Sequence, residues 1–152
     1  MNPIEKRDEG TITMDTIIHA PIENVWKAWT DPSVILSWFG SDSGGKGLQA
    51  NLDVRPGGRF KISFANADHA EHTCFGVYDE VKEFSKLSFS WEWKSEPGVV
   101  SFVTLLLTPE NNITRMHFEH AHVGNASKHD YTHGWRTTFI KLEQVLIQQE
   151  KW

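Results

Sequence analysis

The eight histidines are the residues of this sequence with the widest range of chemistry, because imidazole can hold a metal ion or transfer a proton near neutral pH. His117, His120 and His122 lie close together in the sequence. Alternation along a strand places only His120 and His122 on one face, and no third ligand stands at a spacing that zinc sites use. We therefore predict no metal site, and nothing in the sequence calls for another cofactor.

Two further histidine pairs have simple interpretations. His69 and His72 lie in a segment typical of a solvated turn, with adventitious metal binding as the alternative. His129 and His133 stand four residues apart at the start of a predicted helix and could chelate a metal ion. Asp130 and the helix N-terminus make capping the simpler role there.

His120 is the histidine with a candidate functional role. It follows Phe118 on one strand face, so it could donate a hydrogen bond to a ligand carbonyl or phenol, or act as a general acid or base. The alternative is a histidine satisfied by a backbone group at the strand end. Glu92 and Glu119 have the opposite parity, and the single cysteine, Cys74, is interpreted as a small strand residue. We therefore assign no catalytic residue.

Composition favours a ligand-binding or structural role over several other classes. Seven tryptophans and nine phenylalanines either fill a core or line a pocket for a flat apolar ligand. The net charge is −5 and the 15 basic residues form no cluster, which argues against a nucleic-acid partner. Without an apolar run long enough for a membrane span or a leader peptide, we expect a soluble, cytoplasmic protein with no membrane partner.

The elements that must position these residues follow from hydrophobic periodicity. Residues 11–18 alternate as in a half-buried strand, and Pro21 then marks the start of a short helix that ends at Pro32. A second short helix is expected before a glycine-rich segment at 41–47, which is predicted to be a mobile loop that could act as a lid. Further alternating runs occupy residues 48–54, 59–64, 73–81, 86–93, 99–107 and 113–120.

The last element is a long amphipathic helix from about Asp130, because apolar residues there recur at helical spacing. The predicted fold class is α+β: a curved, antiparallel, seven-stranded sheet wrapped around this C-terminal helix, with two short helices after the first strand. We expect one domain over residues 1–152, with its core at about 11–149. Such a sheet leaves a space between itself and the helix.

Motifs spread along this arrangement carry a family resemblance. They are APIENVWKAWTDP (20–32), WF (38–39), RPGGRF (55–60), GVYDEV (76–81), LSFSW (87–91) and GW (134–135). In their order and spacing the sequence resembles the START-like helix-grip superfamily, also called SRPBCC, which includes relatives of the birch pollen allergen. It is most similar to the group named after the activator of 90-kDa heat-shock protein ATPase homologue.

The resemblance implies a helix-grip fold with a cavity for a hydrophobic ligand. Members of the superfamily bind lipids, sterols, or flavonoid-like and polyketide-like molecules, and a minority catalyse cyclisation or hydrolysis in that cavity. Stimulation of the chaperone ATPase is not expected, because the eukaryotic activator docks through a separate N-terminal domain. A stress-response or protein-interaction module is a further alternative.

We therefore predict that the chain binds a small hydrophobic molecule between the sheet and the C-terminal helix. The alternative is an enzyme that acts on such a molecule with His120 as acid–base. Phe102 and Leu106 could face outward and form a homodimer contact. Strand parity and helical spacing select the following ligand-binding candidates: Trp38, Phe39, Phe60, Phe64, Phe75, Val77, Trp91, Trp93, Phe118, His120, Trp135, Thr138, Phe139 and Leu142.

Overall fold

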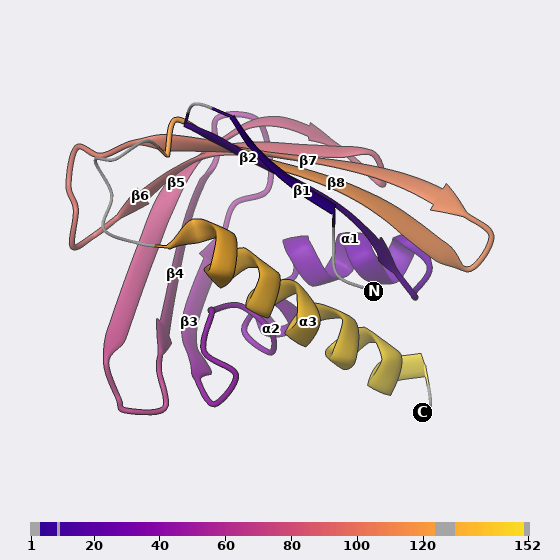
Figure 1. The fold of residues 1–152 in the computed structure, drawn as a ribbon, viewed down its shortest axis with the longest axis horizontal. Helices are drawn as coiled ribbons and strands as arrows, with labels where there is room; N and C mark the ends of the chain where they lie inside the picture. Colours follow the sequence, from indigo (N-terminus) through magenta and orange to yellow (C-terminus); the bar gives the residue numbers. More distant parts are fainter. Residues whose placement is uncertain (1–3, 9, 124–129, 151–152) are drawn as a thin grey trace.

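A computed structural model describes residues 4–8, 10–123 and 130–150. Within these residues one antiparallel sheet has eight strands in the order β1-β2-β8-β7-β6-β5-β4-β3 (Figure 1). The strands are β1 (Ile4–Asp8), β2 (Thr11–Ile18), β3 (Lys46–Leu52), β4 (Arg59–Ala65), β5 (Glu71–Lys82), β6 (Lys86–Trp93), β7 (Ser101–Glu110) and β8 (Ile113–Ala121). The predicted fold class is confirmed. All seven expected strands are present, and β1 adds one more by pairing with β2.

Two short helices follow β2, as predicted. Helix α1 (Ile22–Thr30) begins after Pro21, whose fixed φ of −65° suits a helix start. Helix α2 (Pro32–Ile35) is capped by Asp31, whose carboxylate accepts the backbone N–H of Ser33 at 2.9 Å. This capping keeps α2 close behind α1, so the two helices form one compact cover on the sheet.

Helix α3 (Tyr131–Glu150) runs along the concave side of the sheet (Figure 1). Its buried face carries Trp135 and Phe139, whose rings lie 4.7 and 5.0 Å from that of Phe118 on β8. Ring pairs at this spacing add specific contacts to the burial of apolar area. The helix is therefore held against the middle of the sheet.

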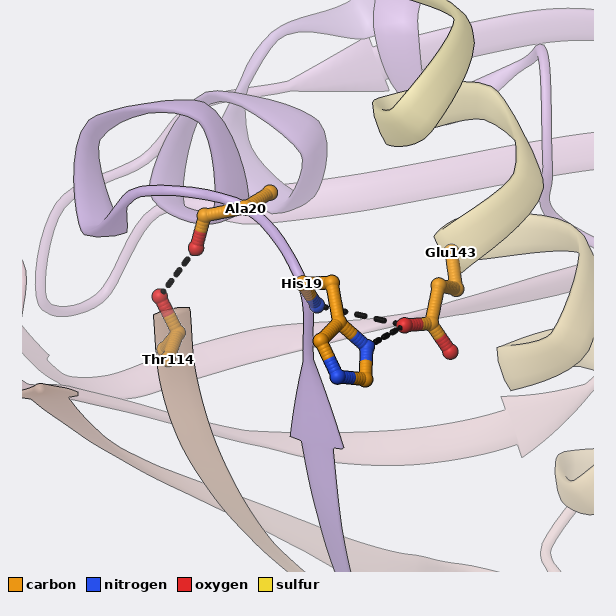
Figure 2. A network of polar contacts seen from close by, with 4 residues as sticks. All are labelled: His19, Ala20, Thr114 and Glu143. Atoms are coloured by element: carbon orange, nitrogen blue, oxygen red, sulfur yellow. Dashed lines mark hydrogen bonds and ion pairs between the residues drawn. The ribbon is translucent and has the colours of Figure 1, made fainter. Parts of the chain in front are cut away.

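Polar contacts join the β2–α1 connection to two other elements (Figure 2). The Thr114 hydroxyl of β8 donates to the Ala20 carbonyl at 2.9 Å. Glu143 of α3 accepts the backbone N–H of His19 at 3.2 Å and also contacts the His19 imidazole. These contacts set the position at which the chain leaves the sheet and enters α1.

Strand β5 corrects one part of the sequence prediction. Phe75 and Val77 were expected to face inward, but Val77 is 40% exposed and Phe75 only half-buried. Cys74 pairs with the inward-facing Ile62, and Gly76 occupies the next inward position. A Cβ on Gly76 would lie 2.0 Å from the Ser90 carbonyl oxygen of β6 and 2.8 Å from the Phe60 ring, so only glycine fits there. The apolar residues Phe75 and Val77 therefore predict the wrong buried face for β5.

The run at residues 99–107 is apolar on both faces, so its sequence does not choose the buried face of β7; the structure does. Phe102 and Leu106 are 48% and 41% exposed on the outer face of the sheet, while their neighbours Val103 and Leu105 are fully buried. Their outward orientation is confirmed. A homodimer contact through these residues stays a prediction.

Candidate functional site

A cavity of about 270 Å³ opens between the first turns of α3, strands β4 to β6 and the loop that follows α2. Six of the predicted ligand-binding residues line it: Phe39, Phe64, Trp91, Trp93, Trp135 and Thr138. All six are buried, and they come from four separate parts of the chain. The fold therefore brings these six together in one wall.

The remaining predicted residues lie elsewhere. Six are buried in the packed interior and do not line this cavity: Trp38, Phe60, Phe118, His120, Phe139 and Leu142. Phe75 and Val77 lie on the outer side of β5, as described above. For the buried six, the sequence identified the inward direction but not the difference between filling the core and lining a space.

Three indole rings form the apolar part of the wall. Trp91 lies 5.2 Å from Trp93 and 5.3 Å from Trp135, ring centre to ring centre. The Trp93 N–H donates to the Tyr131 hydroxyl at 2.7 Å, and the Trp135 N–H donates to His120 Nδ1 at 2.9 Å. These hydrogen bonds hold two of the three rings at fixed angles, so much of the wall is preformed.

His120 lies behind the wall and is fully buried. Because Nδ1 accepts from Trp135, the proton of the neutral ring stands on Nε2, which lies 2.6 Å from the Ser101 hydroxyl. Burial lowers the pKa of His120 from 6.5 to about 3. The imidazole is therefore neutral at pH 7 with both nitrogens engaged, and its observed role is to orient Trp135.

Polar groups surround the mouth of the cavity. The Asn66 amide donates to His72 Nε2 at 3.0 Å, and the His72 ring lies 5.5 Å from that of Phe64. At the start of α3, Asp130 accepts the backbone N–H of His133 at 3.2 Å. Asp130 therefore has the predicted capping role, whereas His129 lies outside the described residues.

His72 is the clearest residue that the sequence analysis missed. Its sequence context predicts a turn with His69, but His72 belongs to β5 and pairs with the inward-facing Phe64. It shares parity with Cys74, so a correct parity for β5 would have identified it. Sequence reasoning also missed other lining residues: Gly40, Ser41, Asn66, Asp130, Tyr131, His133 and Gly134.

The glycine-rich loop is fastened at Asp42. Its carboxylate accepts the backbone N–H groups of Ala67 at 2.8 Å and Gly44 at 2.9 Å, and these bonds, that from Ala67 foremost, lower the pKa of Asp42. The Lys141 amino group on α3 donates to the Asp42 carbonyl at 3.0 Å. Burial lowers the pKa of Lys141. The loop thus joins the β4–β5 turn to α3 beside the cavity.

Other chemistry has limited support in the structure. Among residues 4–8, 10–123 and 130–150, no three histidine, cysteine or acidic side chains are placed to share a metal ion. Cys74 is completely buried, and burial raises the pKa of its thiol. No helix in the described ranges has both the length and the apolar character to cross a bilayer.

Comparison with known proteins agrees with this architecture. A family model described as Activator of Hsp90 ATPase homolog 1-like protein matches residues 19–147. The chain belongs to this family. The predicted membership of the START-like helix-grip superfamily is thereby confirmed, and the family and fold indicate a ligand-binding domain in general. No similar protein was found among curated proteins.

Several solved structures share the fold of this family member. A protein from Nitrosomonas europaea has 22% identity and a TM-score of 0.82, covering 97% of this chain and 100% of its own. The AHSA1-like protein from Aeromonas hydrophila has 22% identity and a TM-score of 0.78, covering 92% and 94%. A protein from Rhizobium leguminosarum has 25% identity and a TM-score of 0.77, covering 95% and 99%.

Proposed function

We propose that this chain binds a small, flat, hydrophobic molecule in the cavity at the first turns of α3. The observation that carries the proposal is a preformed cavity of about 270 Å³ with three tryptophan rings in its wall. This volume is at the lower end for small-molecule pockets. It favours a ligand of two or three fused rings, of flavonoid-like or polyketide-like type, over a sterol or a long acyl chain.

Binding energy would come mainly from contact with the indole faces. Apolar burial contributes about 25 cal/mol per Å², and aromatic pairs add roughly 0.5–1.5 kcal/mol each. Because Trp93 and Trp135 are held by hydrogen bonds to Tyr131 and His120, little side-chain entropy is lost when a ligand enters. The cavity wall is thus suited to a rigid aromatic ligand.

The mouth of the cavity would orient the ligand. Asn66 and His72 present a hydrogen-bonded pair there, and Ser41 and His133 also line the cavity. A polar substituent directed toward these groups would stay hydrated or hydrogen-bonded while the ring system is buried. The bound molecule is therefore amphipathic, with an apolar body and a polar edge.

The role of His120 as an acid–base is not part of this proposal. Both of its ring nitrogens are engaged by Ser101 and Trp135, and it does not line the cavity. Because its pKa is about 3, the His120 ring is neutral at pH 7. Its one N–H proton is on Nε2 and is engaged with Ser101. Binding without chemistry at His120 is the function that this geometry supports best.

The test is an NMR titration of ¹⁵N-labelled protein with a library of fatty acids, sterols, flavonoids and fused-ring aromatics. We expect the aromatics to shift the indole N–H signals of Trp91, Trp93 and Trp135, with the Trp29 signal unchanged as an internal control. If no library member shifts these three signals, the proposal is wrong.

Gly134 offers a matched pair of variants for the same experiment. It lines the cavity on α3, and a Cβ there would meet only the Ser41 Cβ, at an ordinary 3.5 Å. Gly134→Ala should bind as the wild type does and be about 1 kcal/mol more stable, because alanine is the better helix former. Gly134→Leu should fold but lose affinity at least tenfold, since its side chain would occupy the mouth. Unchanged affinity in Gly134→Leu would place the ligand elsewhere.

A further inference from the structure

The three tryptophans of the cavity wall differ in one respect. Trp93 donates its indole N–H to Tyr131, and Trp135 donates its own to His120. Among the residues that the structure describes, the buried Trp91 N–H has no hydrogen-bond partner. A buried donor without an acceptor is costly, and the great majority of such groups in native proteins are paired.

The rings around Trp91 offer no free acceptor for this donor. The rings nearest to the indole are those of Trp93, Trp135 and His120, at 5.2 to 5.6 Å between centres. Indole nitrogens only donate, so the two tryptophans cannot accept. The one accepting nitrogen of His120 is already used by Trp135. The missing acceptor must therefore come from outside these neighbours.

We propose that the ligand supplies this acceptor, and that it is a flat fused-ring molecule with a carbonyl oxygen that accepts a hydrogen bond from Trp91 Nε1. This inference rests on the proposed function, because Trp91 is part of the cavity wall. It narrows the ligand class from any small aromatic to aromatic ketones, quinones and related oxygen acceptors. Trp91 is then the residue that determines specificity.

A pair of probe ligands isolates this single interaction. Fluorene and 9-fluorenone have the same rigid three-ring frame and differ only in a methylene or a carbonyl at one position. Because the two probes also differ in hydration, the informative quantity is the ratio of their Kd values, measured in the wild type and in variants. In Trp91→Phe the Kd of fluorenone should rise roughly tenfold relative to that of fluorene, because tenfold is the size expected for one net hydrogen bond.

Trp93→Phe is the matched control. It removes an indole from the same wall, but that indole donates to Tyr131 and not to a ligand. Its effect on the two Kd values should be equal, so the ratio should stay at the wild-type value. A ratio that changes as much in Trp93→Phe as in Trp91→Phe would show general loss of wall area and overturn the inference.

A measurement on the wild type keeps the inference testable if Trp91→Phe does not fold. The indole ¹H signal of Trp91 should move downfield with fluorenone and not with fluorene. This inference alone is overturned if both probes bind saturably and shift the Trp91 signal equally. It is also overturned if both bind and Trp91→Phe leaves the ratio of their Kd values unchanged. Binding of flavonoids or other library members but of neither probe also counts against it. Absence of binding by the whole library overturns the proposed function, and this inference with it.

Discussion

The interior of this protein has two aromatic regions, and only one of them is open. The closed region lies under α1 and α2, where Trp29, Phe60 and Phe89 leave a void of about 10 Å³, far too small for a ring-sized ligand. The open region lies at the first turns of α3, where Phe64 and Trp91 border a cavity of about 270 Å³. Both regions are built from the same residue types on the same strands.

The difference lies in what faces the aromatic residues. In the closed region α1 contributes Trp29, whose ring lies 4.8 Å from that of Trp38, and Phe60 packs 5.1 Å from Phe89. In the open region α3 contributes Gly134 and the small Thr138 beside the large rings of Tyr131 and Trp135. The cavity therefore lies where small residues of α3 interrupt the aromatic packing. Aromatic content alone is a poor indicator of a binding site.

Two phenylalanines of β4 test the difference between the two regions most directly. Phe60 and Phe64 are 4% and 5% exposed, but Phe60 faces the closed region and Phe64 the cavity. Phe60→Ala should lower the free energy of unfolding by about 3–5 kcal/mol, because it creates a new void in tight packing. Phe64→Ala should cost at least about 1 kcal/mol less, since fewer contacts are lost. Urea unfolding measures both, and equal losses would contradict the distinction.

The pH dependence of the free energy of unfolding tests the state of His120, which lies behind the cavity wall. The His120 pKa is about 3 in the folded protein and about 6.5 when unfolded. Below pH 6.5 the unfolded chain therefore binds a proton that the native state does not. The free energy of unfolding consequently decreases as the pH is lowered. Between pH 6.5 and 4.5 the loss should be about 2 kcal/mol.

His120→Gln is the matched variant for that measurement, because an amide can replace both hydrogen bonds without titrating. Its stability should depend less on pH over the same range. The Asp15 hydrogen bond raises the pKa of His117, which acts in the opposite direction, stabilising at low pH. That contribution is present in both proteins and cancels in the difference. Identical pH profiles would show that His120 titrates normally.

The fastening of the glycine-rich loop distinguishes the open region in a further way. Asp42→Ala removes the acceptor for the backbone N–H groups of Gly44 and Ala67. Hydrogen exchange at both amides should accelerate at least several-fold, and ligand dissociation should become faster. Asp68→Ala is the control, because Asp68 accepts the backbone N–H of Ala70 in the neighbouring turn. Unchanged exchange at Ala67 would mean that the loop is held by other contacts.

Cys74 gives the smallest expected effect. By strand register it lies between Ile62 of the closed region and Trp93 of the open one. Burial raises its pKa, so the native thiol should not react with iodoacetamide at pH 8, with or without a ligand. Labelling followed by mass spectrometry should detect modification only in denaturant. Reaction at the rate of a free thiol would show that the cavity extends to Cys74.

Much of the fold was predictable because it depends on local periodicity. Pro21, the alternation in β4, β6 and β8, and the helical spacing after Asp130 each reflect backbone geometry within a few residues. Parity failed in β5, where small residues occupy the inward positions and Val77 faces solvent. A strand whose core positions hold Cys74 and Gly76 carries a weak signal in the sequence, because the requirement comes from neighbouring strands.

The sequence by itself determined the element types, their order and the inward direction of most aromatic residues, since these follow from periods of two and of about 3.6 residues. Only the tertiary structure decided which of those residues line a space. That depends on the summed volumes of side chains from several distant segments, as with Trp91, Gly134 and Phe39. It also decided that His120 supports Trp135 rather than meeting a ligand, because its partners come from β7 and α3.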